Sequence, residues 1–151
     1  MCSENVTAGA RAVKSGDPAP RRVDPRRALG TLGEDLAAAH LARLGFSTLA
    51  RNVRTRHGEI DLIVFDGHSL AFVEIKTRRT RACSAQTPAE LDPLLWLRQR
   101  QRTRLRKLAA AWLADERRAG VGAPTIRFDA IGVIVDCRDR LVRLDHIEGA
   151  W

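Results

Sequence analysis

The 151-residue sequence contains no tyrosine and only 5% aromatic residues, so stacking of bases on aromatic rings is not expected to be a main source of affinity for nucleic acid. Its three cysteines, an odd number without C-x-x-C spacing, indicate neither a disulfide framework nor a zinc ribbon, and we expect reduced thiols. No apolar run approaches the ~20 residues of a membrane span, and the N-terminus lacks a signal-peptide apolar core. These absences favour a cytoplasmic protein.

What the sequence has in excess is positive charge. The net charge is +8 and the isoelectric point is about 10.8, which favours a polyanionic partner, most commonly nucleic acid. The hydrophobic fraction of 44% and the chain length predict one globular domain with its own core.

The stretch from Gly58 to Arg79 is the most informative part of the chain. It predicts two apolar strands joined at Asp66-Gly67, a dipeptide typical of hairpin turns. Three charged residues interrupt the apolar pattern, and charged residues in strands are costly to bury unless they are paired or bind a metal. They are Asp61 in the first strand and Glu74 and Lys76 in the second.

Strand alternation places these charged side chains on one face of the hairpin. A two-residue turn would pair Asp61 with Phe72, whereas a four-residue loop would pair Asp61 with Glu74. Both registers bring the two carboxylates within about 5–8 Å, which is unfavourable without a cation between them. Mg²⁺ or Mn²⁺ would remove that penalty, and Lys76 would orient a water or steady negative charge. The alternative is a surface hairpin with a solvated Glu74–Lys76 pair.

The D…ExK arrangement on adjacent strands resembles the PD-(D/E)xK nuclease superfamily. The fuller strings GTLGEDLAAAHLARLGF, LARNVRTRHGEIDLIVFDG and AFVEIKTRR are similar to the YraN-like family of uncharacterised bacterial proteins. This resemblance runs from about Leu29 to near the C-terminus. One departure is that Ile60, rather than proline, precedes Asp61. The resemblance implies a restriction-endonuclease-like α/β domain and metal-dependent hydrolysis of phosphodiesters, in which the metal activates a water that Lys76 positions.

The resemblance also implies how the site residues are used. Mg²⁺ or Mn²⁺ would be held by Asp61, Glu74 and the carbonyl of Ile75, with help from Glu34 on the first helix. Glu34 has an alternative role as an acid near a helix N-terminus. Gln101, in the middle of the apolar stripe of the second helix, is either a site residue or a structural amide; relatives more often have Lys near this position.

The expected order of elements is α-β-β-β-α-β-β, which forms a mixed central sheet flanked by helices. These elements make a single domain over residues 29–151, and a disordered basic tail is expected over residues 1–28. A helix is predicted from Leu32 to Leu44, with His40 packed in its apolar arc, and a second from Leu94 to about Arg118. Asp129 is expected at the protein surface. The predicted strands are Phe46–Val53, Glu59–Phe65, Leu70–Thr77, Thr125–Val135 and Leu141–Ile147.

Several arginines near the expected site are predicted to contact phosphates, with solvated surface positions as the alternative. They are Arg54, Arg56, Arg78, Arg79, Arg98, Arg102 and Arg106. The leading hypothesis is an endonuclease acting on DNA, with duplex or branched DNA favoured by the scarcity of aromatic residues. The alternatives are a non-catalytic nucleic-acid-binding module and a basic protein-interaction domain. Junction-resolving relatives act as dimers, but no apolar seam in this sequence requires a homodimer.

Overall fold

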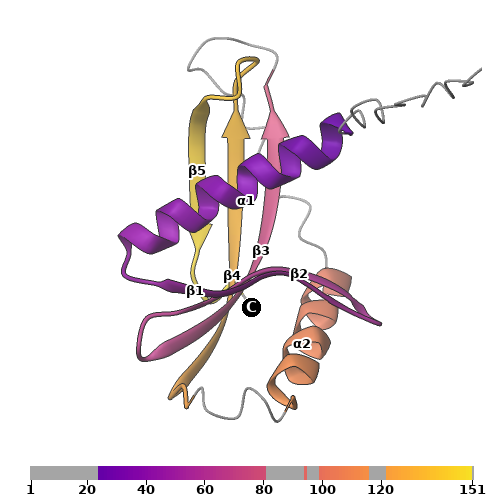
Figure 1. Cartoon of the computed structure of the whole chain (residues 1–151), viewed down its shortest axis with the longest axis vertical. Coiled ribbons are helices and arrows are strands. Elements are labelled where there is room, and N and C mark those ends of the chain that lie inside the picture. Colours follow the sequence, from indigo (N-terminus) through magenta and orange to yellow (C-terminus); the bar gives the residue numbers. More distant parts are fainter. Residues whose placement is uncertain (1–23, 81–93, 95–98, 116–121, 151) are drawn as a thin grey trace, which may run out of the picture.

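The computed structural model of the chain describes residues 24–80, 94, 99–115 and 122–150 (Figure 1). The expected tail therefore lies almost entirely outside the described residues, as does Arg98. The predicted order of helices and strands is confirmed. The elements are α1 (Pro25–Arg43), β1 (Ser47–Thr55), β2 (Gly58–Phe65), β3 (Ser69–Arg79), α2 (Gln99–Leu113), β4 (Thr125–Val135) and β5 (Leu141–Ile147). In the described part of the chain, no helix has the length and apolar character needed to cross a membrane.

The five strands form one mixed sheet in the order β1-β2-β3-β4-β5. Neighbouring strands are antiparallel except β3 and β4, which are parallel. A parallel pair requires a crossover connection, and the segment that contains α2 supplies it. The central strands β3 and β4 are buried over most of their length, which explains their nearly continuous apolar sequences.

The two helices cover opposite faces of the sheet, because alternate strand residues contribute to two separate clusters. On one face Leu62, Val73 and Ile131 pack with Ala37 and Leu41 of α1. On the other face, the aromatic ring of Phe72 and the side chain of Ile63 pack with leucines and Trp112 of α2. Glu74 shares the strand parity of Phe72 and lies on the α2 side, beside Arg104 of that helix.

Helix α1 begins at Pro25, so the prediction that it begins at Leu32 is wrong. Asp24 caps the helix by accepting a hydrogen bond from the backbone N–H of Arg26 at 2.9 Å, and Pro25 occupies the first helical position. This capping signal outweighs the glycine and arginine content that suggested a tail. The additional turns bring Arg26 and Arg27 onto the folded domain.

The β2–β3 hairpin has the four-residue connection, since Phe65 pairs with Leu70. The Asp66 carboxylate accepts hydrogen bonds from the backbone N–H groups of His68 and Ser69, at 2.8 and 2.6 Å. Gly67 has φ +96°, a conformation that favours glycine. Continued by one step, the observed pairing places Asp61 opposite Glu74.

Three smaller expectations are corrected at the β4–β5 side of the sheet. Asp129 is fully buried rather than at the surface, because it accepts hydrogen bonds from Arg127, His146 and the backbone of Gly149. His40 is half-buried and contacts the His146 ring instead of packing in the apolar core. Cys137, in the exposed β4–β5 turn, is disulfide-bonded rather than a reduced thiol. An odd number of cysteines still allows one disulfide pair.

Candidate active site

The sheet divides at the position of the candidate site. Strands β2 and β3 are paired from Phe65 and Leu70 as far as Leu62 and Val73, and no further. Beyond that point β2 is paired only with β1, and β3 only with β4. Asp61 and Glu74 lie just beyond the last paired residues, where the two halves of the sheet separate. Residues of both α1 and α2 line cavities at this place.

Asp61 lies at this division. Its Oδ2 atom accepts a hydrogen bond from the backbone N–H of Ile75 at 2.7 Å, which fixes the carboxylate beside β3. Burial, and next the negative charge of Glu74, raise the pKa of Asp61 to about 7, although the Ile75 hydrogen bond and Lys76 oppose the shift. The raised pKa is the energetic consequence of crowding two carboxylates in a poorly solvated place.

Glu74 is buried, with only 3% of its surface exposed, and has a cation near each oxygen. The ammonium of Lys76 lies 2.5 Å from Oε1, and the guanidinium of Arg104 on α2 lies 3.9 Å from Oε2. A buried carboxylate needs such compensation to remain charged. Glu74 is therefore buried at the division with Lys76 half-buried beside it, which disagrees with the alternative of a solvated surface pair.

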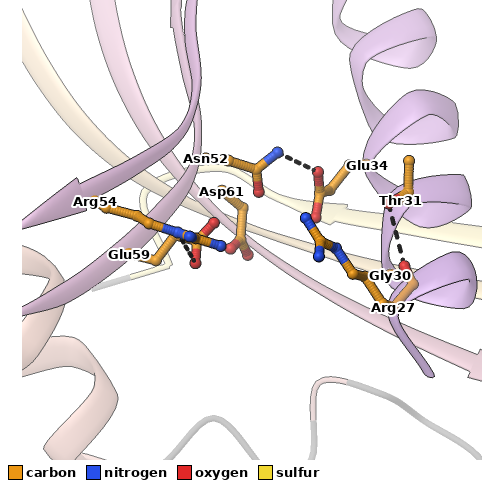
Figure 2. Close-up of a pocket in the computed structure, with 8 residues that line it drawn as sticks. All are labelled: Arg27, Gly30, Thr31, Glu34, Asn52, Arg54, Glu59 and Asp61. Carbon is orange, nitrogen blue, oxygen red and sulfur yellow. Dashed lines mark hydrogen bonds and ion pairs between the residues drawn. The ribbon is translucent and has the colours of Figure 1, made fainter. Parts of the chain in front are cut away.

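Glu34 reaches the site from α1. Its Oε2 atom accepts a hydrogen bond from Nδ2 of Asn52 on β1 at 2.8 Å (Figure 2). Asn52 has φ +50°, a left-handed conformation that asparagine tolerates better than most residues. The adjacent Arg51 forms an ion pair with Asp35 at 2.6 Å, so β1 holds this part of α1 at two successive positions.

Three cavities share Asp61 in their walls. The α1 cavity, of about 630 Å³, also includes Glu34 (Figure 2); the β3 cavity, of about 310 Å³, includes Glu34 and Lys76. The α2 cavity, of about 500 Å³, includes Glu74 and Lys76. The basic side chains that line one or more of these cavities are Arg26, Arg27, Arg54, Lys76 and Arg104. The acids Asp61, Glu74 and Glu34 thus share their cavities with basic side chains.

The residues present are compatible with a hard divalent cation. Among the described residues, no three His, Cys, Asp or Glu side chains are grouped closely enough to hold a metal by themselves. Mg²⁺, however, is commonly bound by one or two carboxylates, with water and phosphate oxygens completing its shell. Asp61 and Glu74 supply such a pair, and the mutual repulsion that raises the Asp61 pKa is what a cation would relieve. Glu34 and Ile75 line cavities that include Asp61.

The other predicted site residues differ in whether they line these three cavities. Gln101 is half-buried on α2, and it is not among the described residues that line the three cavities. Of the predicted arginines that are described, Arg54 lines the α1 and α2 cavities and lies 3.4 Å from Glu59. Arg79 forms an ion pair with Asp139. The predicted phosphate-contacting arginines that are described but line none of the three cavities are Arg56, Arg78, Arg79, Arg102 and Arg106.

Four contributors to the site are not predicted from the sequence. Arg26 and Arg27 fall within the expected tail, although the Asp24-Pro25 pair signals a helix start just before them. Asn52 lies in the predicted strand Phe46–Val53, and no local pattern shows that it meets Glu34. Arg104 is one of several basic residues in the sequence of α2, and only the rotation of α2 about its axis determines which of them reaches Glu74.

Comparison with known proteins identifies the family. Residues 33–133 match the family described as Uncharacterised protein family UPF0102. A UPF0102 protein of Frankia casuarinae is 41% identical over 124 residues, which cover 82% of this chain and 96% of the relative. One from Nocardia farcinica is 40% identical over 132 residues (86% and 94%), and one from Geobacter sulfurreducens is 42% identical over 123 residues (82% and 88%). The resemblance to the YraN-like proteins is thus confirmed, and the chain belongs to the uncharacterised protein family UPF0102.

Proposed function

We propose that this protein is a metal-dependent nuclease that hydrolyses phosphodiester bonds in DNA at the division between β2 and β3. The observation that carries the proposal is the convergence of Asp61, Glu74 and Lys76 on one cavity. A structural role for this set is disfavoured, since Asp61 has a pKa raised to about 7 and thus weakens the fold when it ionises. Perturbed groups in a cavity are typical of functional sites.

The protein residues have distinct roles in this proposal. Asp61 and Glu74 hold Mg²⁺ or Mn²⁺, which when bound acts as a Lewis acid and lowers the pKa of water. Lys76 orients the attacking water and balances negative charge on the phosphate. The backbone N–H of Ile75 keeps Asp61 in place, and Asn52 keeps Glu34 facing the α1 cavity.

The cavity walls favour a substrate recognised through its phosphates. None of the described residues that line the three cavities is aromatic, and five of those named above are basic. Contacts from Arg and Lys to phosphate position a nucleic acid without reading its sequence. Duplex or branched DNA is therefore the proposed substrate class, with no strong preference for sequence.

The test is cleavage of labelled linear and branched DNA by the purified protein with Mg²⁺, Mn²⁺ or EDTA. Asp61→Asn keeps an oxygen that can accept the Ile75 hydrogen bond but removes the charge, and Lys76→Gln removes the ammonium. Each is expected to reduce cleavage at least about 100-fold. Asp35→Asn is the matched control, because Asp35 is exposed and forms a surface ion pair with Arg51.

The outcomes separate the rival functions. Cleavage that survives both site substitutions would identify a contaminating nuclease. DNA binding without cleavage under any of the metals would support the binding module. A protein that neither binds nor cleaves nucleic acid would contradict the proposal and leave the protein-interaction domain.

A further inference from the structure

Arg104 reaches the α2 cavity from a different element than the other charged residues there. Its Nη2 atom lies 3.9 Å from Oε2 of Glu74, while Nζ of Lys76 lies 2.5 Å from Oε1. The two cations therefore approach different oxygens of the same buried carboxylate. Asp61 lines the same cavity, so Arg104 lies beside the group of residues proposed to act on the phosphodiester.

Gly58, at the start of β2, leaves room for this arginine. A Cβ atom at Gly58 would lie 3.4 Å from the Cδ, Nε and Cζ atoms of Arg104, so the guanidinium lies close over the backbone of β2. Gly58 also has φ +133°, where side chains are rarely found. The turn before β2 and the rotation of α2 together direct this arginine into the cavity.

Arg104 helps Lys76 to compensate the charge of Glu74, but this role alone does not account for the Arg104 guanidinium. A separation of 3.9 Å is too long for a hydrogen bond, whereas Lys76 already makes a short contact with the carboxylate. The Arg104 guanidinium donates no hydrogen bond to any of the described residues, and 46% of its side chain is exposed. Its five N–H donors are therefore available to a ligand.

We propose that Arg104 binds a phosphate group of the nucleic-acid backbone in the α2 cavity, on the opposite side of Glu74 from Lys76. The planar guanidinium matches phosphate oxygens with two parallel donors, and the cavity exposes those donors to solvent. This inference rests on the proposed function and adds to it a specific substrate contact from α2. The helix contributes this contact through Arg104 rather than through Gln101.

The test measures DNA binding without cleavage. A fluorescent duplex is titrated with protein in EDTA at several NaCl concentrations, and the slope of log K against log[salt] is compared between variants. Arg104→Gln is expected to reduce the magnitude of the slope by about 0.9, the value for one phosphate contact, and to weaken binding about 10-fold. Arg104→Lys should retain the slope. Arg138→Gln, an exposed turn position outside the cavities, removes the same charge and should change the slope little.

Thermal unfolding of the same variants separates binding from a structural role. If Arg104→Gln lowers Tm but keeps the wild-type salt slope, Arg104 is a counter-ion for Glu74 and the inference is overturned. Equal effects of Arg104→Gln and Arg138→Gln would also overturn it, while leaving the nuclease proposal intact if the wild type cleaves DNA. A wild-type protein that binds no DNA would overturn both.

Discussion

The Asp61 carboxylate accepts a hydrogen bond from the backbone N–H of Ile75 at 2.7 Å, just beyond the last paired residues of β2 and β3. A side chain thus takes over the connection between the strands where the backbone ladder ends. The same carboxylate lines cavities on the α1 and α2 sides. This single contact places an acid with a raised pKa where both helices can supply further site residues.

Asp61 is predicted to destabilise the folded protein at neutral and alkaline pH. Its pKa is raised to about 7 from 3.8, so the folded protein retains a proton that the unfolded chain releases. Stability should therefore fall as pH rises from about 4 to about 7, and the full cost remains above pH 7. Asp61→Asn should increase the free energy of unfolding by about 4 kcal/mol at pH 8 and much less at pH 4. Urea denaturation without divalent ions measures this; a difference independent of pH would contradict it.

Asn52 should contribute through both its side chain and its backbone. Asn52→Gly loses the 2.8 Å hydrogen bond to Glu34 but tolerates φ +50°, whereas Asn52→Ala loses the bond and is strained in that conformation. We expect the alanine variant to unfold with a free energy about 1 kcal/mol lower than the glycine variant. Both should cleave DNA more slowly if Glu34 supports the site. Urea denaturation that finds the two variants equally stable would show that the backbone conformation is not strained.

The two glycines of α1 should respond in opposite directions to alanine. A Cβ atom at Gly33 would lie 1.7 Å from Oγ1 of Thr77, so α1 would have to move away from β3. Gly33→Ala should lower the free energy of unfolding by about 2 kcal/mol or more. At Gly30 an added Cβ meets no neighbouring atom within 4 Å. Gly30→Ala should therefore raise the free energy of unfolding by about 0.5–1 kcal/mol through helix propensity. Thermal or urea unfolding compares them; similar losses in both variants would contradict the close α1–β3 contact.

A pair of histidines should make the contact between α1 and β5 sensitive to acid. Nε2 of His146 lies 2.9 Å from Oδ2 of Asp129, and Nδ1 of His146 lies 3.3 Å from Nε2 of His40. Burial, the His146 charge and Arg43 lower the pKa of His40. The unfolded chain therefore binds a proton on His40 more readily, and stability is lost as pH falls below about 6.5.

His40→Gln can keep a hydrogen bond but cannot be protonated, so the variant should lose less stability than the wild type between about pH 7 and pH 5. Burial would raise the pKa of Asp129, but hydrogen bonds from His146, Gly149 and Arg127 lower it overall. Asp129 should therefore remain ionised over this range. Parallel pH profiles of wild type and His40→Gln in urea denaturation would show that His40 titrates normally in the folded protein. Proton NMR of the His40 ring provides an independent measurement of its pKa.

Alternation within the hairpin predicts that Asp61, Glu74 and Lys76 share a face, because side-chain direction in a strand is a local property, and all three line the α2 cavity. Alternation does not determine the loop length, which the Phe65–Leu70 pairing and the Asp66 hydrogen bonds in the turn decide. Helix periodicity identified the buried stripe of α2 but not the basic residue beside the acids. Gln101 and Arg104 are adjacent on a helix surface, so a small rotation of α2 decides between them.

The order of helices and strands, the basic character of the protein and the shared face of the two acids could all be inferred from residues close together in the chain. Local patterns decide these features, since each depends on neighbours or on composition. The division of the sheet, the meeting of Asn52 with Glu34 and the approach of Arg104 to Glu74 could not be inferred in this way. They depend on how α1 and α2 bury their apolar faces against the sheet, and that burial joins residues far apart in sequence.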